Sequence, residues 1–191
     1  MVQVGVEVEA VDAERKPVPV GAFGHLRCRG PGMSTGFYGE SALSPEKPEG
    51  FRDGWYYPGD IGGFDKDGYI LVKGRLADAI YRRGVEILPL EIEQIIAGHE
   101  SIAEVAVVGI NAKDKTGTDQ QVIGFVVPRS EPQKAALAQY CRANIPTEKF
   151  PDRVYFVRGL PKNANGKLDR LKLKAIAERG PPGGEEKAKG S

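Results

Sequence analysis

The fold is decided by one stretch, Gly74–Glu93, which reads GRLADAIYRRGVEILPLEIE. A short polar segment around Gly84 separates two apolar runs, and this pattern predicts two short strands joined by a turn. Pro89 suits the first turn of a helix, and Glu91 and Glu93 favour the positive end of a helix dipole. The stretch therefore predicts a β-hairpin that leads directly into a helix.

The chain after this stretch continues to alternate between strand and helix patterns. Ile92, Ile95 and Ile96 form one apolar stripe at helical spacing. The order β-β-α-β-β-α-β-loop-α predicts a compact α+β domain whose helices pack on a small sheet. Its further elements are buried strands at 104–110 and 121–127, a helix opened by Pro132 with Leu137, Tyr140 and Cys141 inward, a strand at 153–157, and a helix from about Asp169 with Leu173, Ile176 and Ala177 inward.

The residues before the stretch, 2–73, predict mostly sheet. Apolar and polar residues alternate from Val4 to Ala10, as in a half-buried strand, and a second strand is expected at 25–29. Strands at 61–64 and 69–73 flank a DKDG turn whose Gly68 readily takes a positive φ. Because no capping segment or partner strands precede this sheet, we expect the chain to begin partway through a larger protein.

Composition excludes several function classes. The 191 residues carry 27 basic and 26 acidic side chains, so no global charge favours nucleic acid or an anionic membrane. Cys28 and Cys141 have no metal or disulfide spacing, and His25 and His99 have no metal-like partners, so we expect no metal site and a cytoplasmic location. No apolar run approaches the roughly 20 residues of a membrane-spanning helix, and no signal peptide is evident.

Three ordered motifs carry a resemblance to a known family. They are YYPGD at Tyr56–Asp60, the stretch Gly74–Glu93, and NGKLDR at Asn165–Arg170. Together they resemble the adenylate-forming (AMP-binding) superfamily of acyl-CoA synthetases, luciferases and peptide-synthetase adenylation domains, from about Val2 to about Glu178. The resemblance implies an α+β fold: a small C-terminal lid domain, with a mostly antiparallel sheet flanked by helices, preceded by a β-rich remnant of the large N-terminal domain.

The implied domain boundaries follow from this resemblance and from composition. Residues 1–75 would be the β-rich end of the large adenylation domain, and residues 76–179 the small mobile C-terminal domain. The Gly-, Pro- and charge-rich tail 180–191 cannot bury a core, and we expect it to be disordered.

Asp60 and Arg75 are the candidate nucleotide-binding residues. From the residues alone, Asp60 could cap a turn or accept hydrogen bonds from a ribose, and Arg75 could form a strand-end salt bridge or reach a ribose or phosphate. The resemblance implies that both contact ATP and the acyl-adenylate. Pro58 replaces the Thr or Ser of most relatives, so the local geometry departs from the family pattern.

The resemblance places a hinge at Ala77 and a mobile loop at Arg83–Glu86. Relatives carry Asp or Lys at the hinge, so we expect alanine to shift the conformational balance, which rates of the two half-reactions in an Ala77→Asp variant would test. A register one residue later would give Asp78 this place. From the residues alone, Arg82–Glu86 is a surface hairpin with solvated arginines. The resemblance implies that Arg83, Gly84, Val85 and Glu86 line a pantetheine tunnel in the second half-reaction.

Lys167 is the candidate catalytic residue. A lysine on a polar loop is ordinarily just solvated, but the resemblance implies that Lys167 binds the carboxylate substrate and the α-phosphate during adenylation. Lys162 and Arg170 could steer anionic nucleotide or coenzyme phosphates.

The resemblance implies the C-terminal part of an acyl-CoA ligase that uses ATP, Mg²⁺, CoA and a carboxylic acid, with no nucleic-acid partner and no transmembrane segment. Its phosphate loop and acyl pocket would belong to the missing N-terminal domain, so we expect these residues alone to be inactive and to bind no cofactor tightly. Alternatives are a carrier-protein-dependent adenylation domain, a luciferase-like enzyme, and a degenerate non-catalytic CoA- or nucleotide-binding module.

Overall fold

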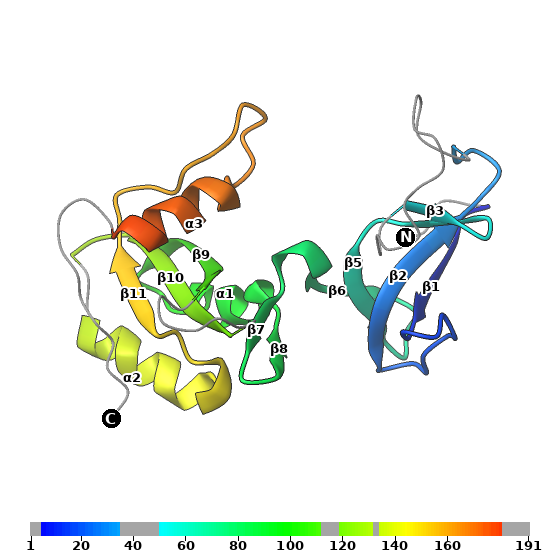
Figure 1. Cartoon of the computed structure of the whole chain (residues 1–191). Helices are drawn as coiled ribbons and strands as arrows, with labels where there is room; N and C mark the ends of the chain where they lie inside the picture. Colours follow the sequence, from blue (N-terminus) through cyan, green and yellow to red (C-terminus); the bar gives the residue numbers. More distant parts are fainter. Residues whose placement is uncertain (1–4, 35–49, 112–118, 132–133, 181–191) are drawn as a thin grey trace. The chain divides into compact units, whose positions relative to one another are not determined.

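The computed structural model describes residues 5–34, 50–111, 119–131 and 134–180, and divides the chain into two compact units, Met1–Ala77 and Asp78–Ser191 (Figure 1). The assignment of these units to parts of a larger enzyme stays a prediction. Apart from Gly180, the tail for which we expected disorder lies outside the described residues.

The first unit is a six-stranded sheet in which every pairing between neighbouring strands is antiparallel. The strands follow the order β3-β4-β2-β5-β6, and β1 pairs with β2. The predicted strands and the turn at Gly68, whose φ is 82°, are confirmed, although Val4 lies outside the described residues. The strands are β1 (Glu7–Val11), β2 (Phe23–Arg29), β3 (Gly50–Arg52), β4 (Trp55–Tyr57), β5 (Asp60–Phe64) and β6 (Ile70–Arg75).

A tight hairpin that we did not predict, β3–β4, completes this sheet. Its turn residues Asp53 and Gly54 have φ values of 50° and 77°, the left-handed conformations that a two-residue Asp-Gly hairpin turn requires. The hairpin places Trp55 in the small core of the unit, where the guanidinium carbons of Arg27 and Arg29 lie 4.3 and 4.2 Å from its ring centroid. This core is stabilised by stacked cations as well as by apolar burial.

The second unit has the predicted order of strands and helices, which confirms the α+β fold class. Pro132, expected to open a helix, lies outside the described residues, so only the later part of that helix is tested. The elements are β7 (Ile80–Arg82), β8 (Val85–Ile87), α1 (Pro89–Ala97), β9 (Ile102–Asn111), β10 (Gln120–Pro128), α2 (Lys134–Asn144), β11 (Arg153–Phe156) and α3 (Arg170–Arg179), with short 3₁₀ helices at Leu76–Asp78 (η1) and Thr147–Lys149 (η2).

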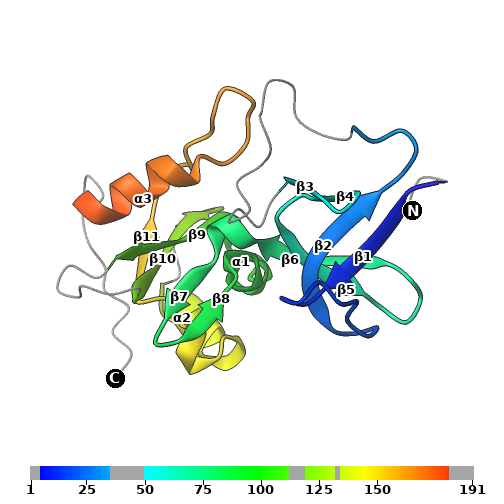
Figure 2. The same cartoon turned by 45° about the vertical axis from the view of Figure 1, so that its right-hand side comes forward.

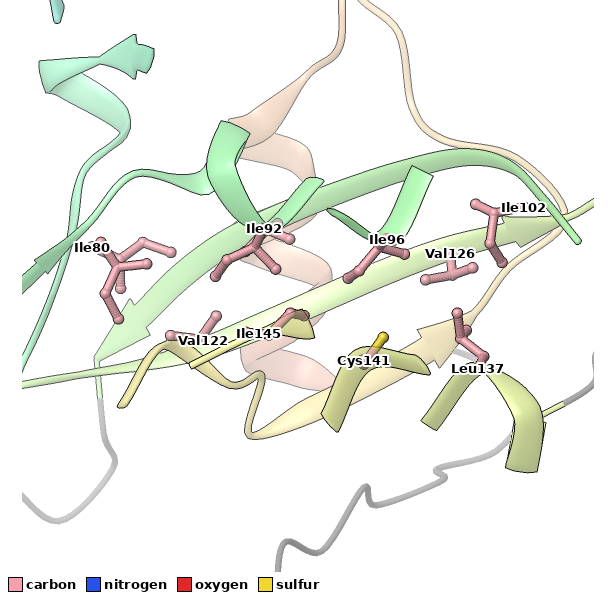
Figure 3. Close-up of a cluster of buried hydrophobic side chains, with 11 residues drawn as sticks. Ile80, Ile92, Ile96, Ile102, Val122, Val126, Leu137, Cys141 and Ile145 are labelled. Atoms are coloured by element: carbon pink, nitrogen blue, oxygen red, sulfur yellow. The ribbon is translucent and has the colours of Figure 1, made fainter. Parts of the chain in front are cut away.

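The three-stranded sheet β11-β10-β9 separates two apolar layers. Strand β10 pairs antiparallel with β9 and parallel with β11. Because side chains alternate along a strand, Val107, Val122 and Val126 pack with isoleucines of α1 and with α2 on one face (Figure 3), while Val108 and Phe125 pack with α3 on the other. Both faces of the sheet are therefore covered by helices. This packing holds α3, and with it the loop that precedes α3, against the sheet.

Two local features explain where the helices and the hairpin sit. Helix α1 begins with Pro89 as its first residue, and α3 begins after Asp169, whose carboxylate accepts a hydrogen bond from the Lys172 amide at 3.0 Å. Gly109 lets β7 lie against β9, because a Cβ atom there would come within 2.9 Å of Ile80. Within the described part of the chain, no helix is both long and apolar enough to cross a membrane.

Candidate active site

Asp60 and Arg75 form an ion pair at one end of the first sheet. Asp60 begins β5 and Arg75 ends β6, and the two residues are direct partners in the antiparallel register. Arg75 Nε lies 3.1 Å from Asp60 Oδ1, and Arg75 Nη2 donates a hydrogen bond to the Pro58 carbonyl oxygen at 2.6 Å. The strand-end salt bridge foreseen for Arg75 is therefore present, and its partner is the other candidate nucleotide-binding residue.

This pair stays accessible to a ligand. The side chains of Arg75 and Asp60 are 57% and 32% exposed. The ion pair involves Oδ1 of the Asp60 carboxylate, which has further acceptor capacity for neutral donors such as the hydroxyls of a ribose. An accessible carboxylate beside a guanidinium suits a molecule that carries both hydroxyls and phosphate.

The candidate hinge lies where the two units are divided. Ala77 is the last residue of the first unit and the middle residue of η1, and Asp78 is the first residue of the second unit. Asp78 Oδ2 lies 3.1 Å from Arg170 Nε, so this residue is held by its own unit. A change of backbone torsion at Ala77 would come immediately before this anchor.

The candidate mobile loop forms the tip of the β7–β8 hairpin. Arg83 and Gly84 have φ values of 51° and 78°, as expected for a tight hairpin turn. The Arg83 amide donates to Asp119 Oδ1 at 2.7 Å, while its side chain is exposed. Below the tip, the Tyr81 hydroxyl donates to Glu86 at 2.9 Å, and burial together with this carboxylate raises the pKa of Tyr81. The tip thus exposes the backbone at Gly84 and the Arg83 guanidinium, both of which a ligand could contact.

The interpretation of this hairpin as a turn with solvated arginines is wrong for Arg82. Its side chain is only 11% exposed, and it bonds the carbonyl oxygens of Glu148 and Phe150 and the carboxylate of Asp152. Asp152 also accepts a hydrogen bond from the Val122 amide at 2.7 Å. Arg82 is thus the anchor of the hairpin, which sequence alone did not reveal because its partners lie 66 to 70 residues away.

Lys167 lies in a closely hydrogen-bonded loop between β11 and α3. The Asn163 side chain accepts hydrogen bonds from the amides of Asn165 and Lys167, each at 3.0 Å, and the Asn163 amide donates to the Lys167 carbonyl at 2.8 Å. Gly166 takes the positive φ that the turn requires, 75°, so Lys167 carries no such strain. The Lys167 side chain is exposed, and among the described residues its ammonium has no ion-pair partner.

The two cations near Lys167 are paired within the second unit. Lys162 Nζ lies 3.2 Å from Glu104 Oε2. Arg170 contacts Asp78 and forms two hydrogen bonds with Glu93, at 2.9 and 3.1 Å. Sequence reasoning gave Glu93 only a role at the helix dipole; a signal for its burial was available, since it lies three residues before Ile96 on the inward side of α1.

No other side-chain cluster competes with these residues in the described ranges. Burial raises the pKa of the Cys141 thiol to about 11, so its reactive thiolate form is scarce at neutral pH, and Cys28 and Cys141 are both unpaired. His99 Nδ1 contacts Ser101 Oγ at 2.8 Å and its ring packs on Tyr140. Across residues 5–34, 50–111, 119–131 and 134–180, no three His, Cys, Asp or Glu side chains gather as metal ligands.

The candidate residues belong to two units, and those of the second unit lie in two places within it. Asp60 and Arg75 are together in the first unit, whereas the β7–β8 hairpin and the Lys167 loop belong to the second. Figures 1 and 2 show the hairpin and the orange loop before α3 at opposite ends of that second unit. The roles of these residues stay predictions.

Comparison with known proteins gives one family. Residues 91–167 match the AMP-binding enzyme C-terminal domain. The chain is 33% identical over 172 residues to the fatty acid–[acyl-carrier-protein] ligase ScoC of Streptomyces coeruleorubidus, covering 89% of this chain and 32% of that protein. It is 33% identical over 167 residues to a 2-succinylbenzoate–CoA ligase of Bacillus cereus, covering 86% and 34%.

A solved structure gives the same result for the fold. ATP-bound MatB from Rhodopseudomonas palustris matches with a TM-score of 0.77 at 28% identity, covering 91% of this chain and 34% of that one. The chain spans about one third of the length of the curated relatives that it matches.

Proposed function

We propose that the chain is the C-terminal part of an ATP-dependent acyl-CoA ligase of the adenylate-forming superfamily, because its residues 91–167 match the AMP-binding enzyme C-terminal domain. The complete enzyme would activate a carboxylic acid as an acyl-adenylate and pass the acyl group to CoA. The names of relatives that join acids to CoA or to a carrier protein support this class of reaction.

The observation that carries the proposal is the state of Lys167. Its two cationic neighbours are held by carboxylates of the second unit, whereas the Lys167 ammonium is exposed and has no ion-pair partner in the described ranges. The loop around it is ordered by the Asn163 side chain, which fixes where its backbone lies. A positioned but unpaired cation is what binding of an anionic substrate requires, because no internal pair has to be broken first.

In the first half-reaction, a carboxylate oxygen of the acid would attack the α-phosphorus of ATP, and the bond between the α-phosphorus and the bridging oxygen would break to release pyrophosphate. Lys167 would stabilise the negative charge on the carboxylate and the α-phosphate. In the second half-reaction, the CoA thiolate would attack the acyl carbonyl carbon, and AMP would leave as the C–O bond breaks. No proton donor for these steps is assigned to this chain.

The other candidate residues would bind and orient the ligands. We propose that Asp60 accepts hydrogen bonds from the ribose hydroxyls and that Arg75 contacts ribose or phosphate, since both remain exposed in their ion pair. Ala77 would be the hinge, and Arg83, Gly84, Val85 and Glu86 would line the pantetheine path. The open space around the Gly84 Cα, where an added Cβ would meet nothing within 4 Å, suits close approach of a ligand to the backbone.

The cofactors would be ATP with Mg²⁺ and CoA. The residues of this chain fit a nucleotide better than a metal, because Asp60 and Arg75 offer hydrogen bonds and charge to a ribose phosphate, while the described residues contain no cluster of metal ligands. Mg²⁺ would then be held by ATP phosphates and by residues outside this chain. We also propose a cytoplasmic location, supported by two unpaired cysteines.

The first experiment follows both half-reactions in the full-length protein. It is supplied with ATP, Mg²⁺, CoA and a panel of short, long and aromatic carboxylates that includes fatty acids, and pyrophosphate and thioester are measured separately. Formation of both products supports an acyl-CoA ligase and identifies its acid. Pyrophosphate without thioester contradicts the CoA step, and no pyrophosphate with any acid contradicts the proposal.

A carrier protein is the alternative acceptor, favoured by the likeness to the acyl-carrier-protein ligase ScoC. Adding a phosphopantetheinyl carrier protein to the same assay separates the two acceptors. Transfer to the carrier but not to CoA would replace the CoA ligase by this alternative.

Replacing Lys167 separates an enzyme from a degenerate binding module. We expect Lys167→Ala to lower the adenylation rate by about 100- to 1000-fold, the usual effect of removing one charge-stabilising group. The matched control is Lys172→Ala, another exposed lysine five positions later on α3. Unchanged adenylation in Lys167→Ala contradicts the assigned role, and an equal loss in the control would show a non-specific effect of charge.

A further inference from the structure

The guanidinium of Arg170 joins three separate elements of the second unit. Its Nη1 and Nη2 atoms donate to the two carboxylate oxygens of Glu93 in α1, at 2.9 and 3.1 Å. Nη1 also donates to the Val107 carbonyl oxygen in β9 at 2.7 Å, and Nε lies 3.1 Å from Asp78 Oδ2. The Val107 amide in turn donates to Glu93 Oε1 at 2.8 Å. We call these four residues the Arg170 network.

The members of the network are not equally held. Glu93 is the most buried acid, with 11% of its side chain exposed, and it has three hydrogen-bond donors. The Asp78 side chain is 27% exposed, and its carboxylate pairs with Arg170 Nε. Loss of the Glu93 charge would leave the partly buried Arg170 guanidinium, 22% exposed, without its bidentate partner, whereas loss of the Asp78 charge leaves Glu93 to satisfy Arg170. Asp78 is therefore the member that can be released without breaking the core.

The position of Asp78 gives this contact a consequence for movement. Asp78 is the first residue of the second unit, directly after the candidate hinge Ala77. Arg170 is the first residue of α3, directly after the helix cap Asp169 and three residues after Lys167. The Arg170 guanidinium thus connects Asp78, the first residue of the unit, to the N-terminus of α3, which directly follows the Lys167 loop.

We propose that Arg170 is a positioning residue that keeps Asp78 and the Lys167 loop in one rigid body, so that torsional change between the units is confined to Leu76 and Ala77. Without the Asp78 contact, backbone torsions would also change in the residues between Ala77 and β7. The Lys167 loop would then no longer move as one rigid body with the start of the second unit. The effect on the two half-reactions rests on the function proposed above; the anchor itself does not.

The anchor can be tested in the chain without any activity. Asp78→Asn removes the charge but keeps the size, and Asp78→Glu is the charge-conserving rescue. The matched control is Glu91→Gln, which breaks a comparable ion pair of the same unit, Lys149–Glu91 at 2.6 Å with both side chains 27% exposed. Readouts are hydrogen exchange of the amides of residues 76–80 and trypsin cleavage after Arg75.

We expect Asp78→Asn to raise exchange and cleavage in this segment about fivefold, as for loss of one partly buried charged hydrogen bond, while Glu91→Gln changes neither. Asp78→Glu should restore at least half of the protection. Exchange in Asp78→Asn equal to the wild type overturns the anchor. An equal increase in Glu91→Gln also overturns it, because the effect would then be a general loss of stability.

The consequence for catalysis is measured in the full-length protein by single-turnover rates of pyrophosphate release and thioester formation. A rigid-body anchor predicts that Asp78→Asn changes the ratio of the two rates by severalfold, whereas a merely structural role lowers both equally. Faster exchange with an unchanged ratio overturns the role in switching. If the wild-type protein releases no pyrophosphate, the proposed function fails, while the exchange experiment still decides whether the anchor exists.

Discussion

The β7–β8 hairpin and the Lys167 loop are built alike but differ in where they hold their strain. Each places an anchored guanidinium, Arg82 or Arg170, close to an exposed cation, Arg83 or Lys167. In the Lys167 loop the positive φ belongs to Gly166, so the lysine backbone is relaxed. In the hairpin, Arg83 itself has a φ of 51°. The Lys167 loop thus exposes its lysine without backbone strain, whereas the hairpin exposes Arg83 in a left-handed conformation that is strained for a residue other than glycine.

The anchors also differ in what they bind. Arg170 pairs with two carboxylates, one of them strongly buried, while Arg82 bonds two backbone carbonyls and one half-exposed carboxylate. A buried charge that loses its partner costs more free energy than a carbonyl that can turn to water. We therefore expect disruption of the Arg170 network to lower the free energy of unfolding more than disruption of the Arg82 contacts.

The largest expected effect on stability is that of Glu93→Ala. It leaves the Arg170 guanidinium and the Val107 amide without their shared acceptor, so we expect the free energy of unfolding of the second unit to fall by about 3 to 5 kcal/mol. Urea unfolding followed by exchange protection of the β9 amides measures this. Trp55, the one tryptophan of the chain, reports on the first unit and should not change its transition.

The control for this prediction is Glu91→Ala, two residues away on the same helix. Glu91 pairs with Lys149, and both side chains are 27% exposed, so we expect a loss of less than about 1 kcal/mol. Equal losses for Glu91→Ala and Glu93→Ala would contradict the idea that the Arg170 network is specially costly to break.

Arg82→Ala is expected to have the intermediate effect. It removes four charge-assisted hydrogen bonds to three acceptor groups, but the carbonyls of Glu148 and Phe150 can be solvated and Asp152 keeps the Val122 amide. We expect the second unit to lose about 2 kcal/mol, less than for Glu93→Ala. The same urea experiment measures it, with the exposed Arg142→Ala in α2 as control. A loss larger than that of Glu93→Ala would reverse the order of the two anchors.

Local patterns were enough to predict the elements but not their long-range polar partners. The strand and helix periods gave the order of the second unit, and the DKDG turn gave the β5–β6 hairpin. The β3–β4 hairpin was missed although Asp53-Gly54 is a strong turn signal, because its strands are only three residues long. Arg82 and Arg170 were read as exposed or ligand-steering cations, since their partners lie up to 92 positions away and no local pattern marks them.

For the site residues, too, sequence motifs identified the residues but not their contacts. Asp60, Arg75 and Lys167 were singled out by their motifs, and their roles stay predictions. What sequence could not give is that Asp60 and Arg75 are register partners, or that Lys167 is the unpaired member of a group of cations in the described chain. Pairing between strands and across a core depends on the whole fold, so these contacts can be seen only in the folded structure of each unit.

Arg83→Gly is expected to have the smallest effect, and in the stabilising direction. Glycine adopts a φ near 51° without steric cost, which relieves about 1 kcal/mol or more of strain, but it adds conformational freedom to the unfolded chain. We expect a net gain of about 0.5 kcal/mol for the second unit, measured by urea unfolding. The matched variant Arg83→Ala removes the same side chain and keeps the strain, so it should gain nothing. If both variants are destabilising to the same degree, the Arg83 side chain itself stabilises the hairpin, and the contrast with the relaxed Lys167 loop would be one of side-chain contacts rather than of backbone strain.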